Sequence, residues 1–149
     1  MIINTKPYGE IEVHEKQKIF FPFGILGFEH LKYFVLFDAR QHPFYWLQSI
    51  DVVEVAFVLI NPRLFKPDYE LVVDKIDLNE IGIESNDDIL DFAIVTIPEN
   101  TAKMTANLQG PIIINRKTKV GRQSITQKSE WKVRHMIMEE LTVVEQKTC

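Results

Sequence analysis

The chain has 149 residues, of which 46% are hydrophobic and 26% charged, and its formal net charge is −4 at pH 7. This length suits one domain with a self-sufficient core, and this composition is that of an ordinary globular protein. An acidic balance argues against direct nucleic-acid binding and favours a basic protein partner. No apolar run approaches the roughly 20 residues needed to cross a membrane, so no membrane association is expected.

The N-terminus and the cysteine content predict a cytoplasmic protein. Residues 1–7 contain no basic region followed by a long apolar run, so we expect no secretory signal. The single cysteine is Cys149, which leaves no internal disulfide and fits a reducing compartment. A thiol at this end of the chain is expected to be mobile and without function.

Most segments are short, rich in Val, Ile, Phe and Tyr, and separated by turn residues, a pattern typical of a β-sandwich or barrel. In chain order, the expected strands are 2–5, 11–13, 33–38, 44–50, 55–60, 69–74, 91–98, 104–108 continuing through 112–114, 121–126 and 131–138. The sequence therefore predicts a mainly β, antiparallel, barrel-like fold in a single domain over residues 1–149.

Three details of these strands make specific expectations. Strand 33–38 has apolar residues at successive positions, so both of its faces should be covered. Strand 69–74 alternates, which places it near a sheet edge, and strands 121–126 and 131–138 should form the last hairpin.

Helix is expected only as one or two short turns within residues 77–86. Asp77 and Glu80 have the spacing of a capping box, and Ser85 and Asp88 repeat it. From about residue 139 the apolar spacing is only weakly helical, so the tail is expected to be frayed or disordered.

The most distinctive stretch is residues 19–29, where four phenylalanines surround Pro22, Gly24 and Gly27. Proline removes a ladder donor, so a central strand cannot run through it. Glycines suit a positive φ or a close approach of two backbones. We therefore predict an ordered turn, the Phe-rich corner, whose aromatic side chains plug one end of the core; the alternative is an ordinary hydrophobic corner.

No set of side chains converges on a catalytic chemistry. The four histidines lack the spacing of a zinc site, and phosphate-binding and nucleophile-elbow motifs are absent. The acidic cluster within residues 84–91 lacks the ligand spacing of a calcium loop. We therefore predict no catalytic residue, no metal and no cofactor, and the protein is not expected to be an enzyme.

Polar residues also stand within otherwise apolar strands. A buried amide must find hydrogen-bond partners, so structural pairing is one interpretation of these residues. The other is that some of them line an open strand edge, whose unpaired N–H and C=O groups can accept a strand from another protein. A β domain without a catalytic set fits a protein-interaction module.

Five pieces of sequence resemble the FliW family of flagellar assembly factors. They are FPFGILGFE at 21–29, LQS at 47–49, AFV at 56–58, NP at 61–62 and TANLQGPIIIN at 105–115. The ordered set is more specific than any one piece, and the resemblance runs from about residue 2 to residue 138. The chain departs from the familiar pattern at Gly110, where the family has alanine before the proline.

The resemblance implies a small cytoplasmic β-barrel-like factor that binds flagellin and also binds CsrA, a dimeric RNA-binding repressor of flagellin translation. It implies a partner switch: accumulated flagellin holds the factor, and export of flagellin releases it to bind CsrA and lift repression. The resemblance leaves open whether the RNA site is blocked directly or altered from elsewhere, and whether the two partners share one site.

The positions that match the family motifs divide into two groups. The glycines and prolines of the first motif are predicted to form the fold, namely Pro22, Gly24 and Gly27 together with Phe28. The predicted partner-binding residues are Gln48, Ser49, Asn61, Asn107, Pro111 and Asn115.

Two alternative functions come from other classes. One is a small-molecule-binding or hydrolytic β-barrel with its pocket at the Phe-rich corner. The other is an RNA-binding barrel that uses the basic turn within residues 116–122, although this turn lacks the interleaved aromatic residues typical of such sites.

Overall fold

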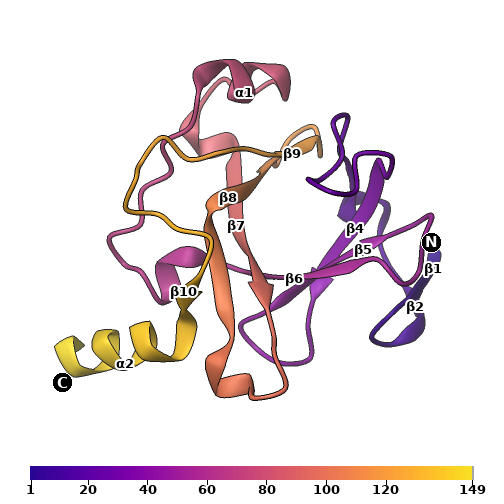
Figure 1. The fold of residues 1–149 in the computed structure, drawn as a ribbon. Coiled ribbons are helices and arrows are strands. Elements are labelled where there is room, and N and C mark those ends of the chain that lie inside the picture. The colour runs from indigo at the N-terminus through magenta and orange to yellow at the C-terminus, as the bar shows by residue number, and fades with distance from the viewer. Residues whose placement is uncertain (149) are drawn as a thin grey trace.

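The computed structural model describes the backbone of residues 1–148 and the side chains of residues 1–142. The expectation for Cys149 lies outside the described residues. An antiparallel sheet of eight strands curls around a central core, and a separate two-stranded hairpin lies beside it (Figure 1).

The strands are β1 (Ile2–Thr5), β2 (Gly9–Glu12), β3 (Lys18–Phe20), β4 (Tyr33–Asp38), β5 (Tyr45–Ser49), β6 (Ala56–Ile60), β7 (Ile89–Thr96), β8 (Thr105–Asn115), β9 (Gly121–Gln123) and β10 (His135–Met136). The α-helices are α1 (Lys75–Glu80) and α2 (Ile137–Thr148). The short 3-10 helices are η1 (Glu15–Gln17), η2 (Pro62–Leu64), η3 (Asn86–Asp88) and η4 (Thr101–Lys103).

The main sheet is nearly closed, which confirms the barrel-like prediction. Its order is β10-β8-β7-β6-β5-β4-β3, and β9 pairs with the second half of β8. A parallel bridge between Phe20 and Val120 brings the end of β3 beside the start of β9. There the Phe20 N–H donates to the Lys119 carbonyl at 2.9 Å. This bridge closes the ring between the first and last parts of the sheet.

Strand β4 is buried on both faces, as its unbroken apolar run predicts. Phe34 and Leu36 point into the barrel core, whereas Val35 and Phe37 pack against the β1–β2 hairpin. The N-terminal hairpin is therefore the cover that the outer face of β4 needs.

Large side chains fill the interior of the barrel. The buried members of this cluster are Ile19, Phe21, Ile25, Leu31, Phe34, Leu47, Leu59, Phe92, Ile112 and Ile114. An interior filled in this way argues against the alternative of a ligand-binding barrel.

The Phe-rich corner is an ordered turn that only partly plugs the core. Phe21 and Ile25 are buried, but Phe23 is 48% exposed and Leu26 74% exposed. Gly24 has φ +67°, and a Cβ there would lie 2.5 Å from the Glu29 Cα atom. The backbone of the turn therefore folds so closely on itself that this position accepts only glycine.

Residues 69–74 do not form the predicted strand. They run as an extended segment over the outer face of the sheet, where Tyr69 and Val73 are buried in two different clusters. The Val72 carbonyl accepts a hydrogen bond from the Gln127 N–H at 2.8 Å, outside the ladder of the sheet. The alternating apolar side chains thus pack the segment against a sheet face, and the segment is not a strand of the sheet.

The predicted last hairpin is also wrong. Strand β9 pairs with residues 112–114, whereas β10 pairs with Thr105 and Ala106 at the other end of β8. The two short strands therefore share one long neighbour and do not meet each other. Trp131, which was placed in the second strand, instead lies buried in the connection between them.

The helical segments are confirmed with one shift. Helix α1 begins one turn earlier than expected, because the Asp74 carboxylate, and not that of Asp77, accepts from the Ile76 N–H and caps the helix. Ser85 caps η3 through the Asp87 N–H, as its spacing predicts. The chain from residue 139 continues in α2. Within the described residues, no helix is long and apolar enough to span a membrane.

Gly24→Ala should destabilise the fold strongly, and Gly9→Ala is the matched control. Both glycines have φ near +68°, but nothing lies within 4 Å of a Cβ at Gly9. The control should cost about 1–2 kcal/mol for its backbone conformation, and Gly24→Ala about 1–3 kcal/mol more because of the clash. Urea unfolding measures both, and equal losses would contradict the close packing of this turn.

Candidate partner-binding site

Gln48 and Ser49 are fully buried and bond within the protein. The Gln48 Oε1 atom accepts from the Lys6 N–H at 2.8 Å, and its Nε2 group donates to the Val53 carbonyl at 2.9 Å. The Ser49 hydroxyl oxygen accepts from the Val52 N–H at 3.1 Å. These bonds tie the turn after β1 and the loop of residues 50–55 to β5, which supports the structural interpretation of both residues.

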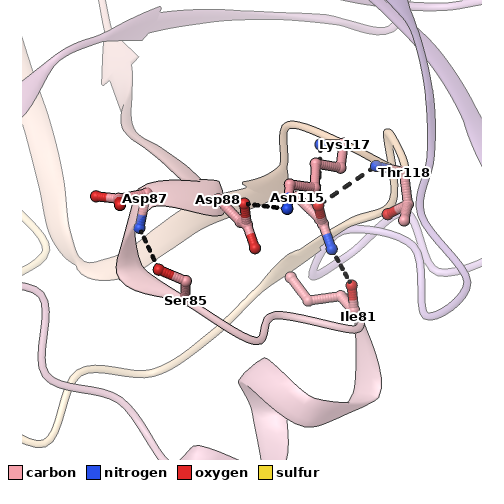
Figure 2. Close-up of polar contacts among 7 residues, drawn as sticks. All are labelled: Ile81, Ser85, Asp87, Asp88, Asn115, Lys117 and Thr118. Carbon is pink, nitrogen blue, oxygen red and sulfur yellow. Dashed lines mark hydrogen bonds and ion pairs between the residues drawn. The ribbon is translucent and has the colours of Figure 1, made fainter.

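Asn115 is the centre of a second buried network (Figure 2). Its Nδ2 group donates to the Ile81 carbonyl at 2.9 Å. Its Oδ1 atom accepts from the N–H groups of Lys117 at 3.0 Å and Thr118 at 3.3 Å. Asn115 therefore joins the end of α1 to the turn after β8, and its amide has no exposed surface to offer a partner.

The neighbouring Asp88 strengthens the same junction. Its backbone carbonyl accepts from the Arg116 N–H at 2.8 Å, and its carboxylate lies 3.3 Å from the Lys117 Nζ atom. The side chain of Lys117 is 71% exposed, so this ion pair is accessible to water and contributes little by itself.

Asn107 and Pro111 interrupt the ladder of β8. The half-buried Asn107 accepts from the N–H groups of Gln109 at 3.0 Å and Gly110 at 2.9 Å. Pro111 is buried, and a Cβ on Gly110 would lie 2.8 Å from the Gln123 Nε2 atom. The glycine that departs from the family pattern thus leaves room for the Gln123 amide, which donates to the Gly110 carbonyl at 3.0 Å.

Asn61 borders a cleft. It is half-buried, and its Oδ1 atom accepts from the Arg63 N–H at 3.1 Å at the start of η2. It lines a cleft of about 180 Å³ together with Tyr45, Arg63 and residues 89–92. Asn61 is therefore the predicted residue whose position suits a contact with another molecule.

A larger cleft of about 550 Å³ continues from this one over the outer face of β7. Arg63, Ile89 and Asp91 line both clefts, and the extended segment of residues 69–73 forms the opposite wall of the larger one. Neither cleft is lined by residues of the Phe-rich corner, where the ligand-binding alternative placed its pocket. We call the two together the β7 cleft.

An ion pair lies where the two parts of the β7 cleft meet. The Arg63 guanidinium binds the Asp91 carboxylate through two bonds of 2.9 and 3.0 Å. Hydrogen bonding to Asp91 raises the pKa of Arg63, and burial raises the pKa of Tyr69, whose ring lies 5.3 Å from the guanidinium. The arginine therefore stays charged and the tyrosine neutral at physiological pH.

Sequence reasoning missed Arg63 and Tyr69 and gave Asp91 only as a member of an acidic cluster. The ion pair joins residues 28 positions apart, and no local spacing signals such a contact. Arg63 does follow the Asn61-Pro62 motif directly, so the helical turn that this motif starts was the available signal. Among the described residues, no group of three or more His, Cys, Asp or Glu side chains is placed to hold a metal ion.

A second surface of interest is acidic. Residues 2–17 and 50–55 contain five carboxylates and two lysines. The carboxylates are all exposed, and none takes part in the ion pairs found among residues 1–142; they are Glu10, Glu12, Glu15, Asp51 and Glu54. Gln48 ties the two segments to β5, and we call these five carboxylates together the acidic face.

Comparison with known protein families gives a full-length match. The family model described as "FliW protein" matches residues 2–137. The chain is 44% identical over 141 residues to the flagellar assembly factor FliW of Treponema denticola, covering 95% of this chain and 96% of that protein. It is 46% identical over 143 residues to the FliW of Thermoanaerobacter pseudethanolicus, covering 95% of each chain.

A solved structure agrees with the sequence comparison. The crystal structure of a flagellar assembly factor FliW superposes with a TM-score of 0.85 at 37% identity, covering 92% of this chain and 96% of that one.

Asn115→Ala should destabilise the protein more than Asn107→Ala. The Asn115 substitution leaves a buried carbonyl and two N–H groups without their partner, which should cost roughly 1–3 kcal/mol. Asn107 is half-buried, so water can replace part of what its side chain provides, and the loss should be roughly 1 kcal/mol or less. Chemical denaturation compares the two, and the reverse order would contradict the structural role of Asn115.

Proposed function

Because the chain belongs to the FliW family of flagellar assembly factors, we propose that it works in the cytoplasm as a partner switch between flagellin and the repressor CsrA. The match of the family model to residues 2–137 is the observation that carries this proposal. The family is one of assembly factors and not of enzymes, so the switch consists of binding alone.

The proposed switch follows the amount of flagellin in the cell. Unexported flagellin occupies the protein, and CsrA remains free to repress flagellin translation. Once flagellin is exported, the protein binds CsrA, and translation resumes. A useful switch needs a CsrA complex with a sub-micromolar dissociation constant, which corresponds to about −8 kcal/mol or better.

The acidic face is the surface that best suits CsrA. An RNA-binding protein presents clustered cations to phosphate, and the same cations are attracted by exposed carboxylates. A bound acidic surface would also repel the RNA backbone, whether it covers the RNA site or lies beside it. The unpaired carboxylates of the N-terminal hairpin and the 50–55 loop therefore support this assignment.

The structure gives less support to direct RNA binding by this protein. In the basic turn, Lys117 pairs with Asp88, and Arg122 pairs with both Asp77 and Glu80. These ion pairs neutralise part of the charge that phosphate binding would need.

Reversing charge on the acidic face should slow CsrA binding. The double variant Glu10→Lys and Glu12→Lys is expected to lower the association rate constant roughly tenfold, because opposite charge accelerates encounter. Stopped-flow fluorescence measures this rate, which should also fall as salt rises.

The control for this prediction is Glu99→Lys with Glu139→Lys. Both glutamates are exposed and lie outside the acidic face. Their substitution by lysine changes the net charge from −4 to 0, as substitution of the first pair does. An equal effect of the two double variants, or a rate indifferent to salt, would contradict a role for the acidic face.

Flagellin should displace CsrA from the protein. When purified flagellin is added to the preformed complex with CsrA, released CsrA is expected to regain binding to the flagellin mRNA leader in a gel-shift assay. A stable complex of all three proteins would contradict the switch, as would a shift of the RNA by this protein alone.

A further inference from the structure

The first half of β7 has an open edge. On one side, β7 pairs with β8 from Ile89 onward. On the other side, β6 reaches only Ala93, Ile94 and Val95, because the chain leaves the sheet at Asn61-Pro62 to form η2. Residues 89–92 therefore form a short stretch of strand with one neighbour, inside a sheet whose ring is otherwise nearly closed.

The hydrogen bonds of β8 show which groups of β7 face this opening. The Asn115 N–H donates to the Val120 carbonyl, so Asn115 and, two residues earlier, Ile113 direct their backbone groups toward β9. In an antiparallel pair, the residues opposite them also direct their backbone N–H and C=O groups away from the shared ladder. These residues are Ile89 and Asp91, so their backbone N–H and C=O groups face the open edge.

Three backbone groups are available there. The Ile89 N–H is used, since it donates to the Asn86 carbonyl. The Ile89 carbonyl and both backbone groups of Asp91 have no partner in β6, and they are absent from the loop, turn and side-chain hydrogen bonds found within residues 1–148. Two acceptors and one donor with this spacing are what an added antiparallel strand requires.

Open space lies beside this edge. The smaller part of the β7 cleft, about 180 Å³, is lined by residues 89–92 themselves. The larger part, about 550 Å³, continues over Ile89 and Asp91 toward the extended segment. A chain entering here would meet an open ladder on one side and side-chain pockets on the other.

We infer that the β7 cleft binds an extended segment of flagellin by strand addition. This inference rests on the proposed function and names the site of one partner. Two cations and two carboxylates line the larger part of the cleft, Arg63 and Lys75 against Glu70 and Asp91, so it has no formal net charge to attract basic CsrA. It suits the partner that would be held by backbone hydrogen bonds and not by opposite charge, and strand addition requires a segment without its own fixed structure.

The test compares two substitutions at one position. Asp91→Pro removes the outward N–H, and proline is tolerated where the N–H faces away from the ladder. Asp91→Ala removes the carboxylate and its bond to Arg63 but keeps the N–H. By calorimetry on the full chain, Asp91→Pro should bind purified flagellin roughly tenfold more weakly than Asp91→Ala. Equal affinities of the two variants would overturn the inference.

CsrA provides the second arm of the experiment. Its affinity should be the same for the two Asp91 variants, and a loss confined to Asp91→Pro in this arm would overturn the assignment of the cleft to flagellin. If the wild-type protein bound flagellin but the Asp91 variants did not differ, only the strand addition would fail. If the wild-type protein did not bind flagellin at all, the proposed function would fail with it.

A measurement on the wild-type chain removes the dependence on folding of the proline variant. Strand addition places the Asp91 amide in a hydrogen bond, so its hydrogen exchange, followed by NMR, should slow roughly tenfold or more when flagellin is added. An exchange rate unchanged by saturating flagellin would overturn the inference.

Discussion

The fold depends on the way strand β8 shares its two edges. One edge pairs with β7, and the other pairs first with β10 and then with β9. Asn107 and Pro111 make this division possible. The Asn107 side chain accepts hydrogen bonds from the N–H groups of Gln109 and Gly110, which leave the ladder, and Pro111 has no N–H group. The register between β7 and β8 shifts at the same place, between Phe92 and Ile94. The interruption of one strand thus positions the end of the barrel, the connection that buries Trp131 and the helix that follows.

The sequence predicts the main features of this fold and fails where the outcome depends on distant partners. The apolar run of β4 correctly indicates two covered faces, and Pro22 with Gly24 correctly indicates a tight turn. An alternating segment such as 69–74 looks the same whether it joins a sheet or lies across one, because side chains alternate in either case. For the candidate site, sequence alone places Asn61 but cannot predict the Arg63–Asp91 contact, which only the folded chain brings together.

The polar residues set into the strands explain what kind of surface remains for partners. Gln48, Ser49 and Asn115 are buried, and their side chains form hydrogen bonds with backbone groups of the protein itself. Motif residues can therefore define a family by maintaining its shape without touching a partner. Among the described residues, the groups that we propose for recognition are backbone groups at an incomplete strand edge and carboxylates on exposed segments. Two surfaces of different chemistry on one small domain suit the two dissimilar partners that we propose.

The amide of Gln48 has a consequence beyond the stability of β5. It connects the turn at Lys6 with the loop at Val53, although these residues are 47 positions apart in the chain, and both segments carry carboxylates of the acidic face. Segments that are held in place in this way lose little conformational entropy when the charges they carry bind a partner. Its geometry is fixed beforehand, so under the proposed function cations spaced to match it would bind better than an equal number of cations in another arrangement.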